Sequence, residues 1–301
     1  MSSTLHPTPP EPDWPAPVSG PVPAPAPLQA LRAELDRLDD QVHDLLMQRA
    51  AVVAQIGALG VKGAVPIRPG REASIIRRLL ARHSGPLPPV GVARIWRAML
   101  NAFTAQQRPV LVTVCEVEPG GGYLMAAREH FGALTPMRAL RTPAQAIREV
   151  SAGVASAAVL PLPADAEAPA AAWWTALLQR DDPRIHVVAR LPFWAARPDA
   201  APAVPALVVC AAAPDPSGED RSLIGMELSV DVSRARLAAA VASAGFGECT
   251  MVLRRDAGAP VAYALLDVDG FVADADPRLA GLPAVRPPVV LGAYAVPVGA
   301  K

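Results

Sequence analysis

The chain has 301 residues, of which 51% are hydrophobic and 19% charged. This composition excludes a wholly disordered chain, and the length predicts two or three domains of roughly 100–200 residues each. Proline contributes 35 residues, about twice its usual share. Ten of these prolines lie within residues 1–27, so this segment is predicted to be a disordered, extended tail.

The formal net charge of zero conceals two oppositely charged parts. Residues 28–108 contain twelve Arg or Lys against six Asp or Glu, a net charge of +6. Residues 109–301 contain sixteen against twenty, a net charge of −4. The first part is therefore predicted to attract anions. Because Lys62 and Lys301 are the only lysines, a catalytic lysine has one plausible candidate, Lys62.

The cysteines indicate a reducing compartment. Cys115, Cys210 and Cys249 are far apart and in no CxxC spacing, which argues against a disulfide framework and against a zinc site. Residues 1–27 hold no Lys or Arg, and the chain has no uninterrupted apolar run of 18 residues. We therefore expect a cytoplasmic protein with no membrane partner.

The first 108 residues carry helical signals. One apolar stripe, spaced alternately by four and three residues, predicts a long helix that breaks at Gly57. The stripe contains Leu31, Leu35, Leu38, Val42, Leu45, Arg49, Val52 and Ile56. Pro69 suits the first turn of a second helix that runs to about His83. A third helix is predicted to end near Gln107, with its inward face formed by Val92, Ile95, Trp96, Met99, Leu100 and Phe103.

From residue 109 onward, strand and helix patterns alternate. Strands are predicted at 109–115, 157–162, 185–191 and 206–211, and helices at 123–131 and 143–152. The last part reads as strand 222–230, helix 232–243, strands 249–255 and 261–270, helix 274–281 and strand 289–296, a ferredoxin-like order. We therefore predict a tail (1–27), an all-α unit (28–108), an α/β lobe (109–213) and an α+β domain (214–301).

Arg49 is the first candidate for chemistry, because an arginine within an apolar helical stripe needs an anion. A carboxylate on a neighbouring helix is the simpler explanation, and a bound anionic ligand is the alternative. Extending the apolar stripe of the second helix backwards places Glu72 on its buried face. Arg32, Arg49 and Arg71 together exceed the charge that one buried glutamate can neutralise, which favours the ligand.

The same segments resemble the all-helical chorismate mutases. The similarity covers about eighty residues of this chain and includes the Leu31–Arg32 start, the Leu46–Arg49 spacing, the Arg71–Glu72 pair and the terminal Gln106–Gln107. It implies an intertwined helical homodimer that converts chorismate to prephenate. Arg32 is then the arginine lent by the partner copy, and Arg49, Arg71, Glu72 and Gln107 are the same-chain residues of the site.

The chemistry of this reaction suits the residues. A Claisen-type rearrangement needs no cofactor and no metal, only a compactly held substrate and donors at the ether oxygen, where negative charge grows. Bidentate arginines match the two substrate carboxylates. The family's lysine for the ether oxygen falls at Gly60 in this sequence. Lys62, two residues later, is the candidate replacement, and Pro69 and Phe103 occupy two further positions where the family has polar residues.

Residues 109–213 resemble a truncated prephenate dehydratase lobe, and the end of the chain resembles an ACT regulatory domain. The dehydratase E-N-T motif is replaced by Leu162, Pro163 and Ala164, and its T-R-F segment is absent. We therefore expect no dehydratase activity. The glycine turn at 120–122 is a tight turn rather than a phosphate loop, and Trp173 and Trp174 are expected to pack within the lobe.

Two other functions compete with the mutase. The first is a catalytically weak or inactive regulatory paralogue that binds an aromatic-pathway ligand or a partner enzyme. The second is nucleic-acid binding, because Arg71, Arg77, Arg78 and Arg82 form a basic face on the second helix. No helix-turn-helix spacing supports nucleic-acid binding, so we expect no nucleic-acid partner.

Overall fold

The computed structural model describes residues 25–59, 66–117, 120–165, 168, 171–195 and 204–299. The chain divides into two units, Met1–Val52 and Val53–Lys301. Most of the predicted tail and the candidate Lys62 lie outside the described residues. Among the helices that the structure does describe, none is long and apolar enough to cross a membrane.

The three helices predicted in the first 108 residues are confirmed. They are α1 (Pro25–Ala58), α2 (Pro69–Ala81) and α3 (Pro89–Gln107). α1 spans a segment without glycine between residues 28 and 56 and ends beside Gly57. Prolines stand in the first turn of both α2 and α3, where a missing backbone N–H costs nothing. Each start was therefore readable from the sequence.

The α/β part adds three helices and two short 3-10 helices. These are α4 (Tyr123–Phe131), α5 (Pro143–Ser151), α6 (Arg234–Ser243), η1 (Trp173–Gln179) and η2 (Pro277–Gly281). The side chain of Thr142 caps α5 by accepting a hydrogen bond from the Gln145 amide. Ser233 caps α6 in the same way, with the Arg236 amide as donor. Such caps satisfy backbone donors that the helix itself leaves unpaired.

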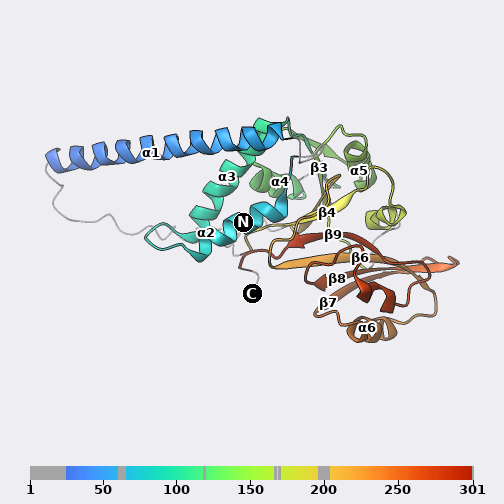
Figure 1. Ribbon diagram of the computed structural model, residues 1–301. Coiled ribbons are helices and arrows are strands. Elements are labelled where there is room, and N and C mark those ends of the chain that lie inside the picture. The colour runs from blue at the N-terminus through green and yellow to red at the C-terminus, as the bar shows by residue number, and fades with distance from the viewer. Residues whose placement is uncertain are drawn as a thin grey trace, which may run out of the picture. The chain divides into compact units, whose positions relative to one another are not determined.

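One mixed sheet of nine strands forms the centre of the second unit (Figure 1). Its strands are β1 (Val112–Cys115), β2 (Met137–Leu140), β3 (Ala157–Pro161), β4 (His186–Leu191), β5 (Ala206–Cys210), β6 (Asp220–Ser229), β7 (Cys249–Arg254), β8 (Val261–Asp269) and β9 (Val289–Ala295). Their spatial order is β2-β1-β3-β5-β4-β9-β6-β8-β7. The sheet thus continues across residue 213, where we predicted a domain boundary, and the boundaries themselves remain a prediction.

Strands β1 and β3 are parallel and covered on both faces. Val112 and Val114 pack on the side of Phe131 from α4. The alternate residues of these strands pack on the side of Val150 from α5, where Leu160 lies. Burial on both faces explains why these strands read as continuous apolar runs in the sequence. Trp173 and Trp174 are buried in the α5-side core, which confirms that they pack within the lobe.

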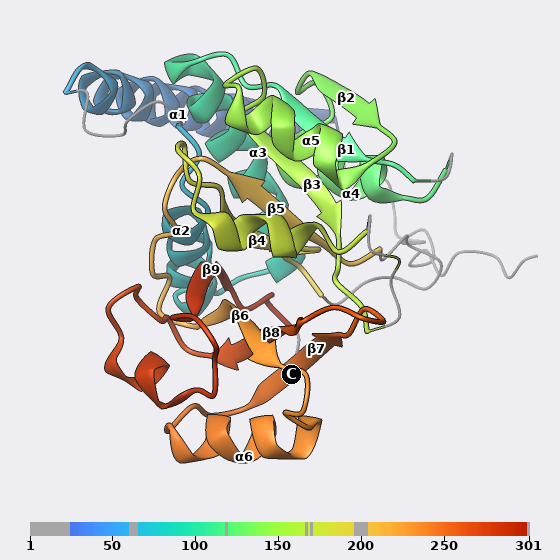
Figure 2. The ribbon, with the colours of Figure 1, turned by 90° about the vertical axis from the view of Figure 1, so that its right-hand side faces the viewer.

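The chain end has the predicted ferredoxin-like order β6-α6-β7-β8-η2-β9, with the second helix reduced to a 3-10 turn. β6 is antiparallel to both β8 and β9. α6 covers one face of these strands (Figure 2), with Leu237 and Val241 in their core. β9 also joins β4 through the Val187–Gly292 pair. Gly292 is required there because a Cβ atom would collide with the Val187 carbonyl, and its φ of 146° disfavours other residues.

Helix α2 is tied to the α/β part by two arginines. Arg68 makes a bidentate ion pair with Asp215, with both N–O distances at 2.5 Å. Arg77 donates to Ser217 Oγ at 2.7 Å and to the Val296 carbonyl at 2.5 Å. Arg77 belongs to the basic face that raised the nucleic-acid alternative, and its donors are engaged within the chain. This contact weakens that alternative.

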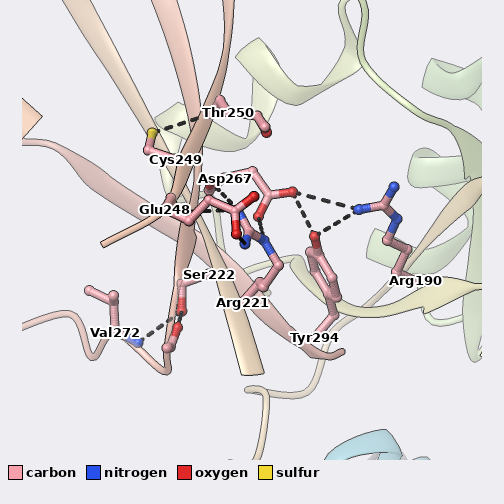
Figure 3. A network of polar contacts seen from close by, with 10 residues as sticks. Arg190, Arg221, Ser222, Glu248, Cys249, Thr250, Asp267, Val272 and Tyr294 are labelled. Carbon is pink, nitrogen blue, oxygen red and sulfur yellow. Dashed lines mark hydrogen bonds and ion pairs between the residues drawn. The ribbon is translucent and has the colours of Figure 1, made fainter. Parts of the chain in front are cut away.

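A polar network joins four strands of the sheet (Figure 3). Asp267 on β8 accepts from Arg221 Nε of β6 at 2.7 Å and from the Tyr294 hydroxyl of β9 at 2.6 Å. The same hydroxyl accepts from Arg190 Nη1 of β4 at 3.2 Å. Tyr294 is buried, so these bonds form in surroundings where an unpaired polar group is costly. The network therefore fastens the chain-end strands to the lobe that precedes them.

Replacing Tyr294 with Phe removes the hydroxyl from this network while keeping the ring. Because a buried hydroxyl with two partners is lost, we expect the free energy of unfolding to fall by about 1–2 kcal/mol. Tyr263→Phe on β8 is the control, since no hydrogen bond of its hydroxyl is seen among the described residues and a change within about 0.5 kcal/mol is expected. Equal losses in chemical denaturation of the two variants would contradict the role given to Tyr294.

Candidate functional site

The predicted site residues fall into three groups. Arg32 and Arg49 lie on the part of α1 that belongs to the first unit, whereas Arg71, Glu72 and Gln107 belong to the second. Lys62 lies outside the described residues. The structure therefore relates only Arg71, Glu72 and Gln107 to one another. That all six residues form one site remains a prediction.

Arg71 and Glu72 are neighbours in the first turn of α2 with opposite environments. Glu72 is 8% exposed, and Arg71 is exposed. Successive residues of an α-helix point about 100° apart, because there are 3.6 residues per turn. A carboxylate in the first turn also lies near the positive end of the helix dipole. The prediction that Glu72 lies on the buried face of the second helix is confirmed.

The buried carboxylate of Glu72 is paired with Arg97 of α3. Arg97 Nη1 donates to Glu72 Oε2 at 2.6 Å, and Arg97 is also only 8% exposed. Burial lowers the pKa of the Arg97 guanidinium, although the charge of Glu72 opposes this shift. Each charge compensates the other, because either one alone would be costly in this position.

Gln107 is the last residue of the same helix. Its Nε2 donates to the Phe103 carbonyl at 3.1 Å. Ten residues separate Gln107 from Arg97, which corresponds to about 15 Å along the helix axis. In the described chain, the carboxylate of Glu72 is therefore held near the middle of α3, and the Gln107 amide lies at the C-terminal end of that helix.

Sequence reasoning missed Arg97. The buried residues of α3 are Val92, Ala93, Arg97 and Leu100. Ile95, which we predicted to face inward, is 53% exposed, so this prediction is wrong. The buried face is turned toward Ala93 and Arg97 because Glu72 supplies a charge partner for an arginine there. The spacing of Ala93, Arg97 and Leu100 by four and three residues is the sequence signal for this buried face. It was missed because a charged residue such as Arg97 does not count as part of an apolar stripe.

A cavity of about 470 Å³ lies beside the Glu72–Arg97 pair. Its walls come from α2, α3, α4 and the segment that follows β4. His130 lines it and is 7% exposed. The Asn101 side chain, at the cavity, donates to the backbone carbonyl of His130 at 2.8 Å. Burial, and secondarily the charge of Arg97, lower the pKa of the His130 imidazole well below its ordinary value, so the ring is neutral near pH 7.

The described residues include no group of three or more His, Cys, Asp or Glu side chains placed to hold a metal ion. The three cysteines are free, with Cys115 and Cys210 buried. Burial raises the pKa of both thiols to about 11, so neither is a thiolate near pH 7.

Residues 31–108 match the family described as chorismate mutase type II. The bifunctional chorismate mutase/prephenate dehydratase of Pseudomonas aeruginosa is 31% identical over 145 residues, which cover 45% of this chain and 38% of the relative. The bifunctional chorismate mutase/prephenate dehydratase of Neisseria gonorrhoeae is 33% identical over 132 residues, which cover 44% of this chain and 36% of the relative. The chain thus aligns with well under half the length of these relatives.

The similarity to the bifunctional relatives extends beyond the helical region. Residues 1–108 make up less of the chain than the 45% that is aligned with the Pseudomonas protein, so the alignment continues into the α/β part. Among solved structures, the prephenate dehydratase of Streptococcus mutans is similar with a TM-score of 0.44 and 12% identity over 62% of this chain and 97% of its own. Residues 31–108 are thus similar to the chorismate mutase type II family, and the similarity to the bifunctional relatives continues into the α/β part.

The pH dependence of stability tests the environment of His130. An unfolded histidine titrates near pH 6.5, and the folded one titrates well below this value. Below about pH 6.5 the unfolded chain binds a proton that the folded chain does not, so the free energy of unfolding falls as the pH falls, by up to about 1.4 kcal/mol per pH unit. His130→Phe should flatten this part of the profile. Parallel profiles for both proteins in urea unfolding would show that His130 is not buried as described.

Proposed function

We propose that the helical region catalyses the rearrangement of chorismate to prephenate. The observation that carries this proposal is the match of residues 31–108 to the chorismate mutase type II family. The net charge of +6 on residues 28–108 supports it, because the substrate carries two carboxylates. The reaction needs orientation and electrostatic stabilisation rather than a nucleophile.

In the proposed mechanism, arginines hold the substrate and neutral or cationic donors meet its ether oxygen. Arg49 and Arg71, with Arg32 of a second copy, form bidentate contacts with the two carboxylates. Gln107 and Lys62 donate to the ether oxygen as negative charge grows in the transition state. Glu72 accepts the hydrogen bond of the substrate hydroxyl, which requires its carboxylate to exchange Arg97 for the substrate.

We also propose that the chain forms a homodimer through α1. The predicted stripe of apolar residues on this helix is exposed in a single chain, with exposed fractions from 42% to 63% between Leu31 and Leu45. A helix of 34 residues with such a stripe gains stability by burying it against another helix. A second copy of the chain supplies a helix with the same stripe, and it would also bring the second Arg32 to the site.

The α/β region is proposed to lack dehydratase activity. The positions that resemble the dehydratase E-N-T motif are Leu162, Pro163 and Ala164. These side chains offer no acid, amide or hydroxyl for polarising a substrate or moving a proton. The relatives are bifunctional by name, so dehydratase activity should be assayed separately from mutase activity. When prephenate is added to the purified chain as the substrate, no phenylpyruvate is expected to form.

A catalytically weak or inactive regulatory paralogue is the second candidate. The Glu72–Arg97 pair favours it, because a carboxylate that remains with Arg97 cannot serve a substrate near Gln107. This candidate predicts that chorismate binds without turnover. Calorimetry with chorismate, together with the rate measurement below, separates the two functions.

The mutase proposal is tested by the disappearance of chorismate in the presence of the full chain and its variants. Arg49→Ala should lower kcat/KM by about 100-fold, because a charged hydrogen-bonding partner of a carboxylate is lost. Arg37→Ala is the matched control, since Arg37 lies on the same helix in an exposed pair with Glu34, and it should retain activity. No turnover by the intact chain would overturn the proposal.

A further inference from the structure

The cavity beside the Glu72–Arg97 pair has the makeup of a small-molecule site. Its volume is about 470 Å³, within the range of ligand pockets in proteins. Apolar side chains dominate its walls, among them Ile76, Val90, Leu191, Phe193 and Trp194. Such a lining favours a ligand with a ring or another compact apolar body, because burial of apolar surface is the main gain on binding.

His130 is the first polar group that faces this cavity. It is more than nine-tenths buried, and its ring makes an edge contact with Phe131 at 4.8 Å between centroids. No hydrogen bond to either ring nitrogen is seen among the described residues, although a buried polar group normally has a partner. The imidazole therefore offers a donor and an acceptor to a molecule in the cavity.

Arg97 is the second polar group. Nη1 is bonded to Glu72, and the guanidinium stacks on the Phe193 ring at 4.9 Å from its centroid. A guanidinium has five N–H donors, and the Glu72 contact uses only one edge of the group. Arg94 also lines the cavity and is exposed, so the lining carries two arginines against the single carboxylate of Glu129.

We propose that this cavity binds a small monocarboxylate with an aromatic or alicyclic ring. The ring lies against Phe193, Trp194 and Ile76, and the carboxylate accepts from Arg97 and from the His130 N–H. The site is built from α3 of the helical region together with α4 and the segment after β4. A ligand there would contact both regions at once. The proposal goes beyond the mutase activity and does not depend on turnover.

Phenylacetate is the probe for isothermal titration calorimetry with the full chain. We expect one saturable site in the millimolar range or tighter. Phenylethanol, which keeps the ring and lacks the charge, and acetate, which keeps the charge and lacks the ring, should bind at least tenfold more weakly. Absence of saturable phenylacetate binding, or equal binding of phenylethanol, would overturn the proposal.

Two variants on α3 locate the site. Ala98 lines the cavity, whereas Ala102 lies one turn further along the helix and does not line it, and both are exposed. Ala98→Phe should weaken phenylacetate binding at least tenfold, and Ala102→Phe should leave it unchanged. Ala126→Phe fills the cavity from α4, and it provides the same test if Ala98→Phe does not fold.

Arg49→Ala separates this site from the proposed mutase site. We expect Arg49→Ala to bind phenylacetate as tightly as the unaltered chain, even if its chorismate turnover is lost. Loss of phenylacetate binding in Arg49→Ala, with binding retained in Ala98→Phe, would assign the probe to the mutase site and overturn the cavity proposal. Failure of the mutase assay alone leaves the binding result intact.

Discussion

The buried ion pair between Glu72 and Arg97 is the constraint on which the arrangement of α2 and α3 depends. Both residues are 8% exposed, and their charged atoms lie 2.6 Å apart. Neither charge can remain buried without the other except at a cost of several kcal/mol. The pair therefore fixes the buried face of α3, places Arg97 at the cavity and determines the surroundings of the Glu72 carboxylate.

The same two helices connect the helical region to the α/β part. Arg68, which precedes α2, and Arg77 of α2 bind the segment from Asp215 to Ser217, which leads into β6. α3 forms a wall of the cavity that α4 completes. In the two proposals, a substrate that takes the Glu72 carboxylate from Arg97 would leave the Arg97 guanidinium free to bind a carboxylate in the cavity. Under these two proposals, Arg97 would couple the two sites.

Much of the fold could be predicted from the sequence because its signals were local. Pro69 marked the start of α2, Gly57 marked the end of α1, and apolar runs marked β1, β3 and β5. β2 (Met137–Leu140) was missed because it is a four-residue edge strand with exposed Arg138 and Ala139. The Arg97 partner of Glu72 could not be predicted, because the pair joins residues 25 positions apart and a charged residue on a helix is expected to face solvent.

A double-mutant cycle on the buried pair tests this account most directly. The free energy of unfolding would be measured for the unaltered chain, Glu72→Leu, Arg97→Met and the double variant. We predict that each single variant loses about 3–5 kcal/mol, because a buried charge is left uncompensated, and that the double variant loses far less than the sum. Losses that add within about 0.5 kcal/mol would mean that the two charges do not depend on each other, and would contradict the account.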